Sequence, residues 1–371
     1  DVAASVTLAP ADTSIGQGRS YALIATVRDS ANKVIAGPVK FTSFDTTVAT
    51  VTSGGTVTGV GPGTASIQAV SGPASKQASV TVVDSSIVAT DTVGGTPFGS
   101  AATNSGVVYV LRVYGNGGSR FDLPGTKHTG TFPLDPTPLS VAFDSAGTTA
   151  YVSSLGANLV QVVSVATGNV TDSIPFPATP YIVKVSPDDK TLWVTTNSDS
   201  LYQVDRGTKA TLQVFGTVGT GNAITFGRND SMVYVSSQNQ YVDEFNYKTK
   251  TPGRSFTFST TAQGMAVSPD GTLLYVADEG SGQLETINLG SGTMTSVGTP
   301  GGGPFDLQLS PDGTKIWVSL SQSGLVQEWD RATMTRLRTI PVNGVPRRIA
   351  VTPASSLVVV PNESGYVTFI K

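Results

Sequence analysis

Apolar and polar residues alternate along short runs over most of the chain, and turn-forming residues separate these runs. In residues 307–319, one alternating run is followed by the turn Ser310-Pro311-Asp312-Gly313 and then by a second alternating run. Alternation with a period of two predicts strands, because successive side chains of a strand point to opposite faces of its sheet. We find no sustained apolar spacing of three and four residues, which would predict helices. The pattern therefore predicts an all-β protein.

The strand pattern of residues 307–330 recurs along the chain at a nearly fixed spacing. An aromatic residue in the second strand marks six of the units, and a valine takes its place in the seventh. The markers are Tyr109, Tyr151, Trp193, Tyr234, Tyr275, Trp317 and Val359, which are 41 or 42 residues apart. A period of this length with several short strands per unit is typical of β-propeller blades. The repeat predicts a seven-bladed propeller over residues 84–371.

The last repeat lacks a fourth strand. Residues 365–371 correspond to the third strands of the other units, such as residues 324–330. Residues 87–93 have the pattern of a fourth strand, yet they precede the first unit. We expect residues 87–93 to pair with residues 365–371 and to complete the seventh blade, which would remove the exposed edges of an open ring.

Residues 1–83 form a segment with a strand pattern of their own. Alternation is clear in residues 20–27 and 64–70, and a last strand is expected at residues 78–83. About seven short strands with frequent Gly and Pro turns predict a β-sandwich. Only residues 84–86 separate this domain from the propeller, and a flexible tether would need a longer run of Gly, Ser or Pro. We therefore expect the two domains to abut.

Three consecutive runs in the first segment, residues 48–52, 55–60 and 62–69, resemble the bacterial Ig-like domain of group 2. The resemblance covers nearly all of residues 4–83. Phe41 stands where that family often has tryptophan, which keeps the core position aromatic. Such domains are commonly spacers, stalks or adhesive modules of extracellular bacterial proteins. The resemblance implies one of these roles, and a rigid spacer is favoured because no polar groups gather in this segment.

The repeats resemble the YVTN family of seven-bladed propellers over residues 86–371. Each unit supplies most of the set P-x-x-hydrophobic, S-P-D-G, Y-V and V-x-V-hydrophobic-D. The S-P-D-G turns occur at residues 268–271 and 310–313. Proline presets such a turn, aspartate caps it, and glycine supplies the positive φ.

The innermost strands of a propeller line a central channel, and ligands usually bind where loops enter these strands on one rim. Counting back from the markers predicts seven rim positions: Phe98, Leu139, Tyr181, Asn222, Gln263, Phe305 and Arg347. The residues expected beside them on the rim are Asp306, Arg348, Asp278, Glu279 and Glu363. Aromatic faces with scattered polar groups suit a glycan or an extracellular protein as ligand. In the alternative, the aromatic residues pack between blades, and Asp306 pairs with Arg347 or Arg348.

Composition limits the classes of function. The net charge is −3 and no basic cluster exceeds Arg347-Arg348, so we expect no nucleic-acid partner. No apolar run approaches the roughly 20 residues that span a bilayer. The chain has no cysteine, which excludes disulfides and thiolate sites and fits a secreted bacterial protein. Its one histidine, His128, is predicted in the outer strand of the first blade, so we expect no catalytic triad, no metal and no cofactor.

These observations predict a non-enzymatic binding or scaffold protein that is secreted or lies on the bacterial surface, although the chain shows no signal peptide. Its Ig-like spacer would present a propeller that binds a glycan or a protein on its channel face. One alternative is a self-assembling subunit of a surface layer or filament. Another is a polysaccharide hydrolase or lyase that uses paired carboxylates among Asp278, Glu279, Asp306 and Glu363.

Overall fold

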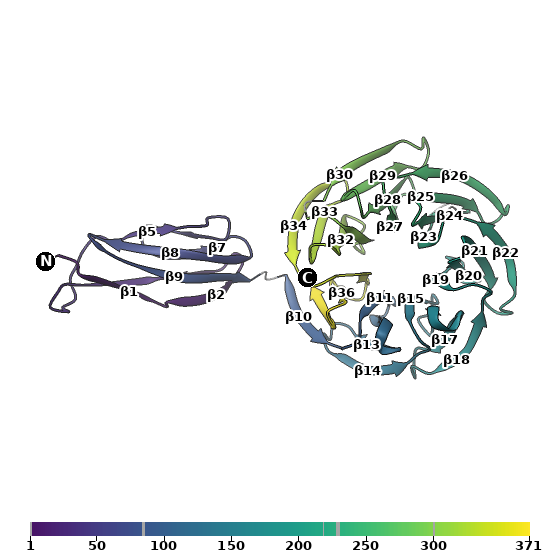
Figure 1. The fold of residues 1–371 in the computed structure, drawn as a ribbon, viewed down its shortest axis with the longest axis horizontal. Coiled ribbons are helices and arrows are strands. Elements are labelled where there is room, and N and C mark those ends of the chain that lie inside the picture. The colour runs from purple at the N-terminus through teal and green to yellow at the C-terminus, as the bar shows by residue number, and fades with distance from the viewer. Residues whose placement is uncertain (1, 84–85, 218, 228–230, 300) are drawn as a thin grey trace. The chain divides into compact units, whose positions relative to one another are not determined.

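The computed structural model describes residues 2–83, 86–217, 219–227, 231–299 and 301–371. Within these residues the chain forms strands and two short 3-10 helices, η1 (Val113–Gly115) and η2 (Leu155–Ala157) (Figure 1). It divides into two compact units, Asp1–Ser86 and Ile87–Lys371. Residues 84 and 85 lie outside the described residues, so the expected short junction between the domains stays a prediction.

The first unit is built from three sheets around one apolar core. The sheets are β1 (Ser5–Ala9) with β4 (Ile24–Arg28); β2 (Asp12–Gly16), β9 (Ala74–Val83), β8 (Gly63–Ser71) and β5 (Lys40–Ser43); and β3 (Ser20–Ala22), β7 (Thr56–Gly59) and β6 (Ala49–Val51). Alternate residues of β8 are buried, and Ile67 contributes to the core together with Val57 and Val80. The period-two pattern thus places one face of each strand inside.

The second unit consists of seven four-stranded antiparallel sheets arranged as a ring (Figure 1). Blades one to three are β11 (Pro97–Ala102), β12 (Val107–Arg112), β13 (Gly117–Asp122) and β14 (His128–Pro133); β15 (Pro138–Phe143), β16 (Thr149–Ser154), β17 (Leu159–Ser164) and β18 (Val170–Pro175); and β19 (Pro180–Val185), β20 (Thr191–Thr196), β21 (Ser200–Asp205) and β22 (Thr211–Gly216). Blades four to six are β23 (Gly221–Phe226), β24 (Met232–Ser237), β25 (Tyr241–Asn246) and β26 (Thr251–Thr257); β27 (Ala262–Val267), β28 (Leu273–Asp278), β29 (Gln283–Asn288) and β30 (Met294–Gly298); and β31 (Pro304–Leu309), β32 (Lys315–Leu320), β33 (Leu325–Asp330) and β34 (Thr335–Pro341). Blade seven is β35 (Ala350–Val351), β36 (Val358–Asn362), β37 (Tyr366–Ile370) and β10 (Ile87–Thr92). The fold is therefore all-β, with Ig-like sheets followed by a seven-bladed propeller.

Strand β10 closes the ring, as the missing fourth strand of the last repeat predicts. It pairs with β37 in antiparallel register, with Thr90 opposite Thr368 and Thr92 opposite Tyr366. The pairing continues beyond the strands, because the Val93 amide donates a hydrogen bond of 3.0 Å to the Gly365 carbonyl. The predicted closure of blade seven by residues 87–93 is confirmed.

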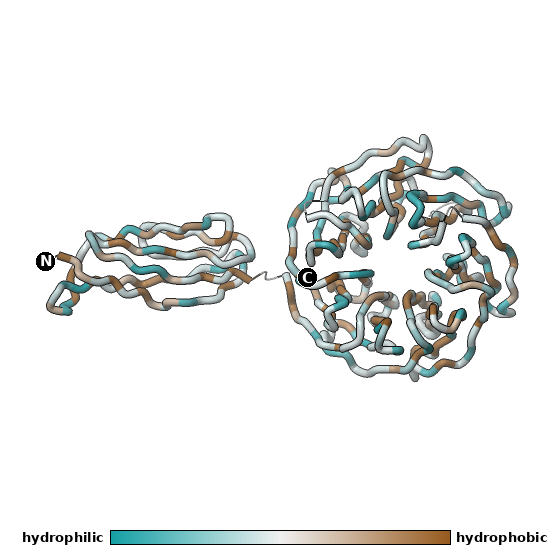
Figure 2. The backbone as a smooth tube through the Cα atoms, in the orientation of Figure 1, coloured by the Kyte–Doolittle hydropathy of each residue, from teal (hydrophilic) through white to brown (hydrophobic). Residues whose placement is uncertain are grey.

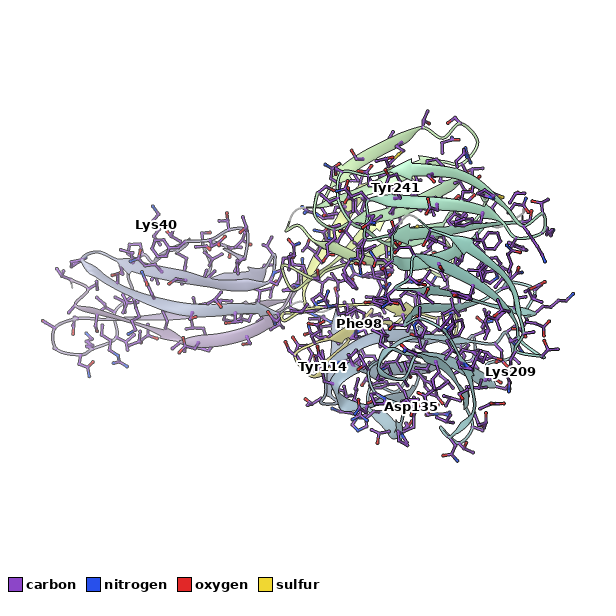
Figure 3. The ribbon with its side chains drawn as sticks, turned by 45° about the vertical axis from the view of Figure 1, so that its right-hand side comes forward. Lys40, Phe98, Tyr114, Asp135, Lys209 and Tyr241 are labelled. Atoms are coloured by element: carbon purple, nitrogen blue, oxygen red, sulfur yellow. The ribbon has the colours of Figure 1, made fainter. Side chains whose placement is uncertain are left out.

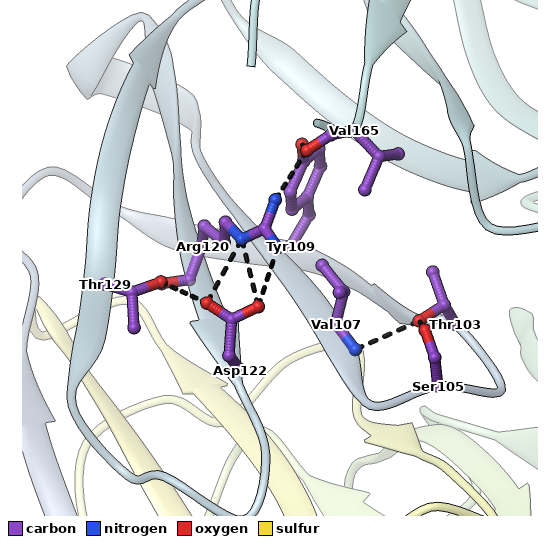
Figure 4. A network of polar contacts seen from close by, with 8 residues as sticks. All are labelled: Thr103, Ser105, Val107, Tyr109, Arg120, Asp122, Thr129 and Val165. Carbon is purple, nitrogen blue, oxygen red and sulfur yellow. Dashed lines mark hydrogen bonds and ion pairs between the residues drawn. The ribbon is translucent and has the colours of Figure 1, made fainter. Parts of the chain in front are cut away.

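Hydrophobic and hydrophilic residues alternate along the strands of the blades (Figure 2), and the apolar ones pack between neighbouring blades. Tyr109 and Phe132 of blade one, for example, belong to the same buried cluster as Val152 of blade two. Polar groups add to this contact, because Tyr109 Oη and Arg120 Nη1 both donate hydrogen bonds to the carbonyl of Val165, at 3.3 and 2.5 Å (Figure 4). The repeated aromatic markers are thus core residues between blades.

Candidate functional site

Residues from all seven blades meet in one pocket at a mouth of the propeller channel. Its cavity has a volume of about 180 Å³. Six of the seven predicted rim positions line it: Phe98, Leu139, Tyr181, Asn222, Gln263 and Phe305. Arg348, Leu155, Ile182 and Gln238 complete the lining. We call this cavity the rim pocket. In Figure 3, Phe98 lies inside the outline of the second unit, whereas Lys209 lies near its outer edge.

A β-bulge directs the rim residues toward the pocket. The register between the first and second strands shifts at each of these positions: between Pro97 and Ser100, Pro138 and Ser140, Pro180 and Val183, Gly221 and Ala223, Ala262 and Met265, and Pro304 and Asp306. A bulge leaves a backbone group unpaired and re-aims a side chain. The same irregularity in six blades explains why residues far apart in sequence converge on one cavity.

Buried hydroxyl groups two residues after the markers compensate for the bulges. Ser153 Oγ accepts a hydrogen bond of 3.0 Å from the Ser140 amide and donates one of 2.7 Å to the carbonyl of Tyr181 in the next blade. Thr195 Oγ1 does the same for the amide of Ile182 and the carbonyl of Gly221, at 3.1 Å each. These hydroxyls satisfy backbone groups that the strand ladder leaves without partners, and they fix neighbouring inner strands to each other.

The aromatic side of the rim is built around Arg347. The rings of Phe98 and Phe305 meet edge to face with 5.6 Å between their centroids. The Arg347 guanidinium lies 4.5 Å from the Phe305 centroid and 5.2 Å from that of Phe98. Arg347 Nε is also 2.7 Å from Glu363 Oε1. Arg347 thus supports the two rings and neutralises Glu363, which leaves Arg348 to contribute charge to the rim pocket.

The amide side of the rim is formed by Asn222 and Gln263. Asn222 Nδ2 donates to the Ala262 carbonyl at 3.0 Å, and Gln263 Nε2 donates to Glu279 Oε2 at 2.7 Å. The other Glu279 oxygen accepts a hydrogen bond of 3.0 Å from Ser321 Oγ. Among the described residues, none donates a hydrogen bond to the amide oxygen of Asn222 or Gln263. These two oxygens can therefore accept hydrogen bonds from a ligand.

Asp278, which we expected on the rim, is fully buried at the end of β28. Its carboxylate accepts hydrogen bonds from Ser259 Oγ at 2.9 Å and from Thr260 Oγ1. The carboxylate therefore anchors the loop before β27 and presents no surface to the rim pocket. Counting along the repeat finds the strand end correctly, but it does not give the direction of the side chain.

Asp306 lies below the rim in the wall of the channel and is 4% exposed. Asp306 Oδ2 accepts a hydrogen bond of 2.9 Å from the Ile349 amide, and Oδ1 is 4.0 Å from Arg348 Nη1. Arg348 Nη2 also donates to the Asn222 carbonyl. Burial raises the pKa of Asp306, while Arg348 and Lys184 act in the opposite direction. The alternative pairing considered for Asp306 is thus observed with Arg348, whereas Arg347 pairs with Glu363.

The carboxylates considered for glycan cleavage all have structural partners in this arrangement. Asp278 and Glu279 accept hydrogen bonds, Glu363 pairs with Arg347, and Asp306 is buried beside Arg348. Among the described residues, no three histidine or acidic side chains are grouped so that they could hold a metal ion. The geometry of the rim pocket thus suits recognition of a ligand by stacking and hydrogen bonds.

Sequence reasoning missed Lys184 in β19. This residue lines a second cavity of about 40 Å³ beneath the rim pocket, together with Asp306 and Arg348. Lys184 stands three residues after the rim position Tyr181, on a strand already assigned to the channel. The positions three residues after each rim position, which lie one level deeper in the channel, include Lys184.

His128 lies in β14, the outermost strand of the first blade, as the repeat predicts. Its Nδ1 is 2.7 Å from Asp91 Oδ2, and Lys127 Nζ is 2.8 Å from Asp91 Oδ1. Asp91 belongs to β10, so these contacts join the closing strand to the first blade. The histidine has a structural role at the point where the ring closes.

Comparison with known proteins supports the two parts of the chain separately. Residues 2–82 match the bacterial Ig-like domain (group 2) family. The chain is similar in fold to a solved structure of hydrazine synthase from Kuenenia stuttgartiensis, with a TM-score of 0.68 and 16% identity over 74% of this chain and 95% of that chain. At this identity the likeness shows the fold alone. No curated protein matches the chain.

The chain thus combines a bacterial Ig-like domain with a seven-bladed β-propeller. The resemblance of the propeller to the YVTN family stays a prediction. Within the described residues, none of the helices has the length and apolar content needed to cross a membrane.

Proposed function

We propose that this protein is a secreted or cell-surface bacterial binding protein whose rim pocket holds one residue of a glycan. The observation that carries this proposal is the convergence of aromatic, amide and guanidinium groups from six blades on one cavity. Sugars present apolar faces and hydroxyl groups together, and aromatic side chains with hydrogen-bonding neighbours are complementary to both.

The dimensions and chemistry of the rim pocket favour a small part of a ligand. Its volume of about 180 Å³ is below the range of about 300–1,000 Å³ that is typical of sites enclosing a drug-sized molecule. Tyr181 is partly exposed and offers a ring, while Asn222 and Gln263 offer amide oxygens. A single sugar residue at the end of a chain fits these groups better than a flat protein surface does, because a stable protein partner covers about 800 Å² per side.

The bacterial Ig-like domain supports a location outside the cell. Domains of this family are commonly spacers on extracellular bacterial proteins, and residues 2–83 as described gather no polar side chains into a site of their own. In the proposed arrangement this domain carries the propeller, and the propeller carries the binding site.

Binding of the purified protein to a panel of immobilised glycans tests the proposal. The dissociation constant for the glycan retained best is then measured by calorimetry for the wild type and for Tyr181→Ala. We expect the variant to bind about tenfold more weakly or worse, because it loses a stacking face worth roughly 1 kcal/mol or more. Tyr114→Ala is the matched control, since Tyr114 is 81% exposed and does not line the rim pocket.

The proposal is wrong if no glycan retains the protein, or if Tyr181→Ala and Tyr114→Ala bind equally well. Retention of extracellular proteins in place of glycans, with the same loss in Tyr181→Ala, would identify a protein ligand at the same pocket.

A further inference from the structure

Lys184 is an unusual residue for its level of the channel. The equivalent positions of the other six blades are three residues after the rim positions: Ala101, Ala142, Thr225, Ala266, Gln308 and Ala350. Four of these are alanine and none is charged, so Lys184 brings the one cationic group found at this level of the repeat. It lines the 40 Å³ cavity below the rim pocket and also the wider cavity of about 540 Å³ at the opposite mouth.

The 40 Å³ cavity, which we call the channel cavity, contains more positive than negative charge. Its ionisable lining groups are Lys184, Arg348 and Asp306, and the polar residues Ser100, Ser140 and Gln308 also line it. Asp306 already interacts with the Ile349 amide and with Arg348. The cavity thus has two cationic groups and one carboxylate.

Donor groups of both cations lack partners at this place. Within the described part of the chain, no side chain or carbonyl accepts a hydrogen bond from Lys184 Nζ, and no carboxylate lies within ion-pair distance of it. Arg348 Nε is buried and has no hydrogen-bond partner among the described residues. Lys184 is partly exposed, whereas buried polar groups such as Arg348 Nε normally have partners. The channel cavity thus lacks an acceptor with negative charge.

The electrostatic environment agrees with this imbalance. Burial lowers the pKa of Lys184; Asp306 opposes the effect and Arg348 adds to it. Burial likewise lowers the pKa of Arg348. An anion in the cavity would compensate both cations and would give Arg348 Nε an acceptor.

We propose that a small monovalent anion binds in the channel cavity between Lys184 and Arg348, either as a free ion or as the carboxylate of a ligand in the rim pocket. A water molecule needs roughly 10–15 Å³ of such volume, so 40 Å³ accommodates a halide ion or one carboxylate group. Arg348 lines both the rim pocket and the channel cavity, and guanidinium groups bind carboxylates through paired hydrogen bonds. The version in which the anion is the carboxylate of a bound ligand rests on the proposed function, whereas the version in which a free ion binds does not.

Bromide-soaked crystals test the free ion, because bromide scatters anomalously. We expect an anomalous peak in the channel cavity of the wild type and of Lys190→Met, and no peak in Lys184→Met. Lys190 is an exposed lysine of the same blade and serves as the control. In solution, replacing a bulky sulfonate, which has no carboxylate, by bromide at constant ionic strength should raise the melting temperature of the wild type and of Lys190→Met by about 3 °C at tenfold excess over Kd, and leave Lys184→Met unchanged.

Calorimetry with glucuronate and glucose tests the carboxylate source. If the anion is part of the ligand, wild-type protein binds glucuronate at least tenfold more tightly than glucose, and Lys184→Met loses this preference. A bromide peak with equal affinities for the two sugars identifies a free ion. If neither sugar binds, the proposed glycan site loses support while the bromide experiment still decides the anion site.

The inference is overturned if wild-type crystals show no bromide in the channel cavity and the protein does not prefer glucuronate. A 13C NMR titration of the Lys184 Cε that shows a neutral amine at pH 7 would then explain how the channel tolerates this side chain. The wild-type measurements decide the question even if Lys184→Met fails to fold.

Discussion

At the scale of single residues, the rim pocket depends on side chains that never touch it. Ser153 has no exposed surface, yet its hydroxyl satisfies the Ser140 amide and the Tyr181 carbonyl. Such a hydroxyl permits the bulge that turns Leu139 toward the pocket, and it fixes the strand that carries Tyr181. The position of a binding residue is thus set by a hydroxyl in the preceding blade.

Ser153→Ala should lower the free energy of unfolding by about 1–3 kcal/mol, because the substitution leaves a buried amide and a buried carbonyl without this partner. Urea unfolding followed by circular dichroism measures the change. Ser173→Ala is the control, since Ser173 is exposed on the outer strand of the same blade. Equal stabilities of the two variants would show that the hydroxyl does not hold the bulge.

Residue-level prediction from the sequence succeeded where the repeat alone decides position. The count from the markers placed Phe98, Tyr181 and Asn222 at the same level of the channel, and all three line the rim pocket. The count could not show that Asp278 points to Ser259 and Thr260, because the direction of a side chain at a strand end depends on the neighbouring loop. Lys184 lies three residues beyond the rim position Tyr181, so counting to the rim positions alone does not include it.

At the scale of elements, the closing strand β10 is held by more than its ladder with β37. Asp91 on β10 is 4% exposed and accepts hydrogen bonds from the backbone amide of His128, at 2.8 Å, and from Lys127. Burial opposes ionisation, but the hydrogen bonds from Lys127 and His128 outweigh it and lower the pKa of Asp91. The ionised carboxylate thus fastens the last blade to the first.

Because the folded state lowers the pKa of Asp91, this group stabilises the fold above the pKa of an unfolded aspartate, about 4, and the contribution disappears as the pH falls through the folded pKa. Asp91→Asn should therefore be less stable than the wild type at pH 7, and the difference should shrink below about pH 4. Urea unfolding at a series of pH values measures this difference.

Asp172→Asn is a suitable comparison for Asp91→Asn, because Asp172 forms an exposed ion pair with Lys209 on the outer strand of blade two. Exposed ion pairs contribute at most about 1 kcal/mol. Two results would refute the role of Asp91 in joining β10 to the first blade. Asp91→Asn could lose no more stability than Asp172→Asn, or its loss could grow on acidification.

The repeat predicts β10 and its partner strand, but it does not predict the contacts of Asp91 with Lys127 and His128. The pattern of residues 87–93 matches the fourth strands of other units, and that match is sufficient to assign the pairing with β37. The contact between Asp91 and His128 depends on how adjacent blades meet at the outer edge.

Blade seven also differs from the others in its inner strand, since β35 contains only Ala350 and Val351. An isolated bridge between Pro346 and Asn362 lies at the position where the inner strands of the other blades begin.

At the scale of the whole molecule, we expect the propeller to need its own strand β10 but not the first unit. Residues 87–371 include all seven four-stranded sheets, whereas residues 95–371 lack the outer strand of blade seven. The shorter segment would expose β37 as an edge, and exposed edges promote aggregation.

We expect residues 87–371 to fold with a sharp thermal transition and residues 95–371 to aggregate or to lose cooperative unfolding. Size-exclusion chromatography and scanning calorimetry distinguish these results. If residues 95–371 melt at the same temperature as residues 87–371, the ring does not depend on its closing strand.

The pairing of Ile87 with Ile370 also decides how the propeller would respond to tension. The chain enters and leaves the ring at two adjacent points of one antiparallel pair, so a pull applied at residues 86 and 371 would bypass the other six blades. Such a pull would unzip β10 from β37, breaking one residue pair at a time from Ile87 and Ile370 to Thr92 and Tyr366. Mechanical load on the chain would thus open blade seven first.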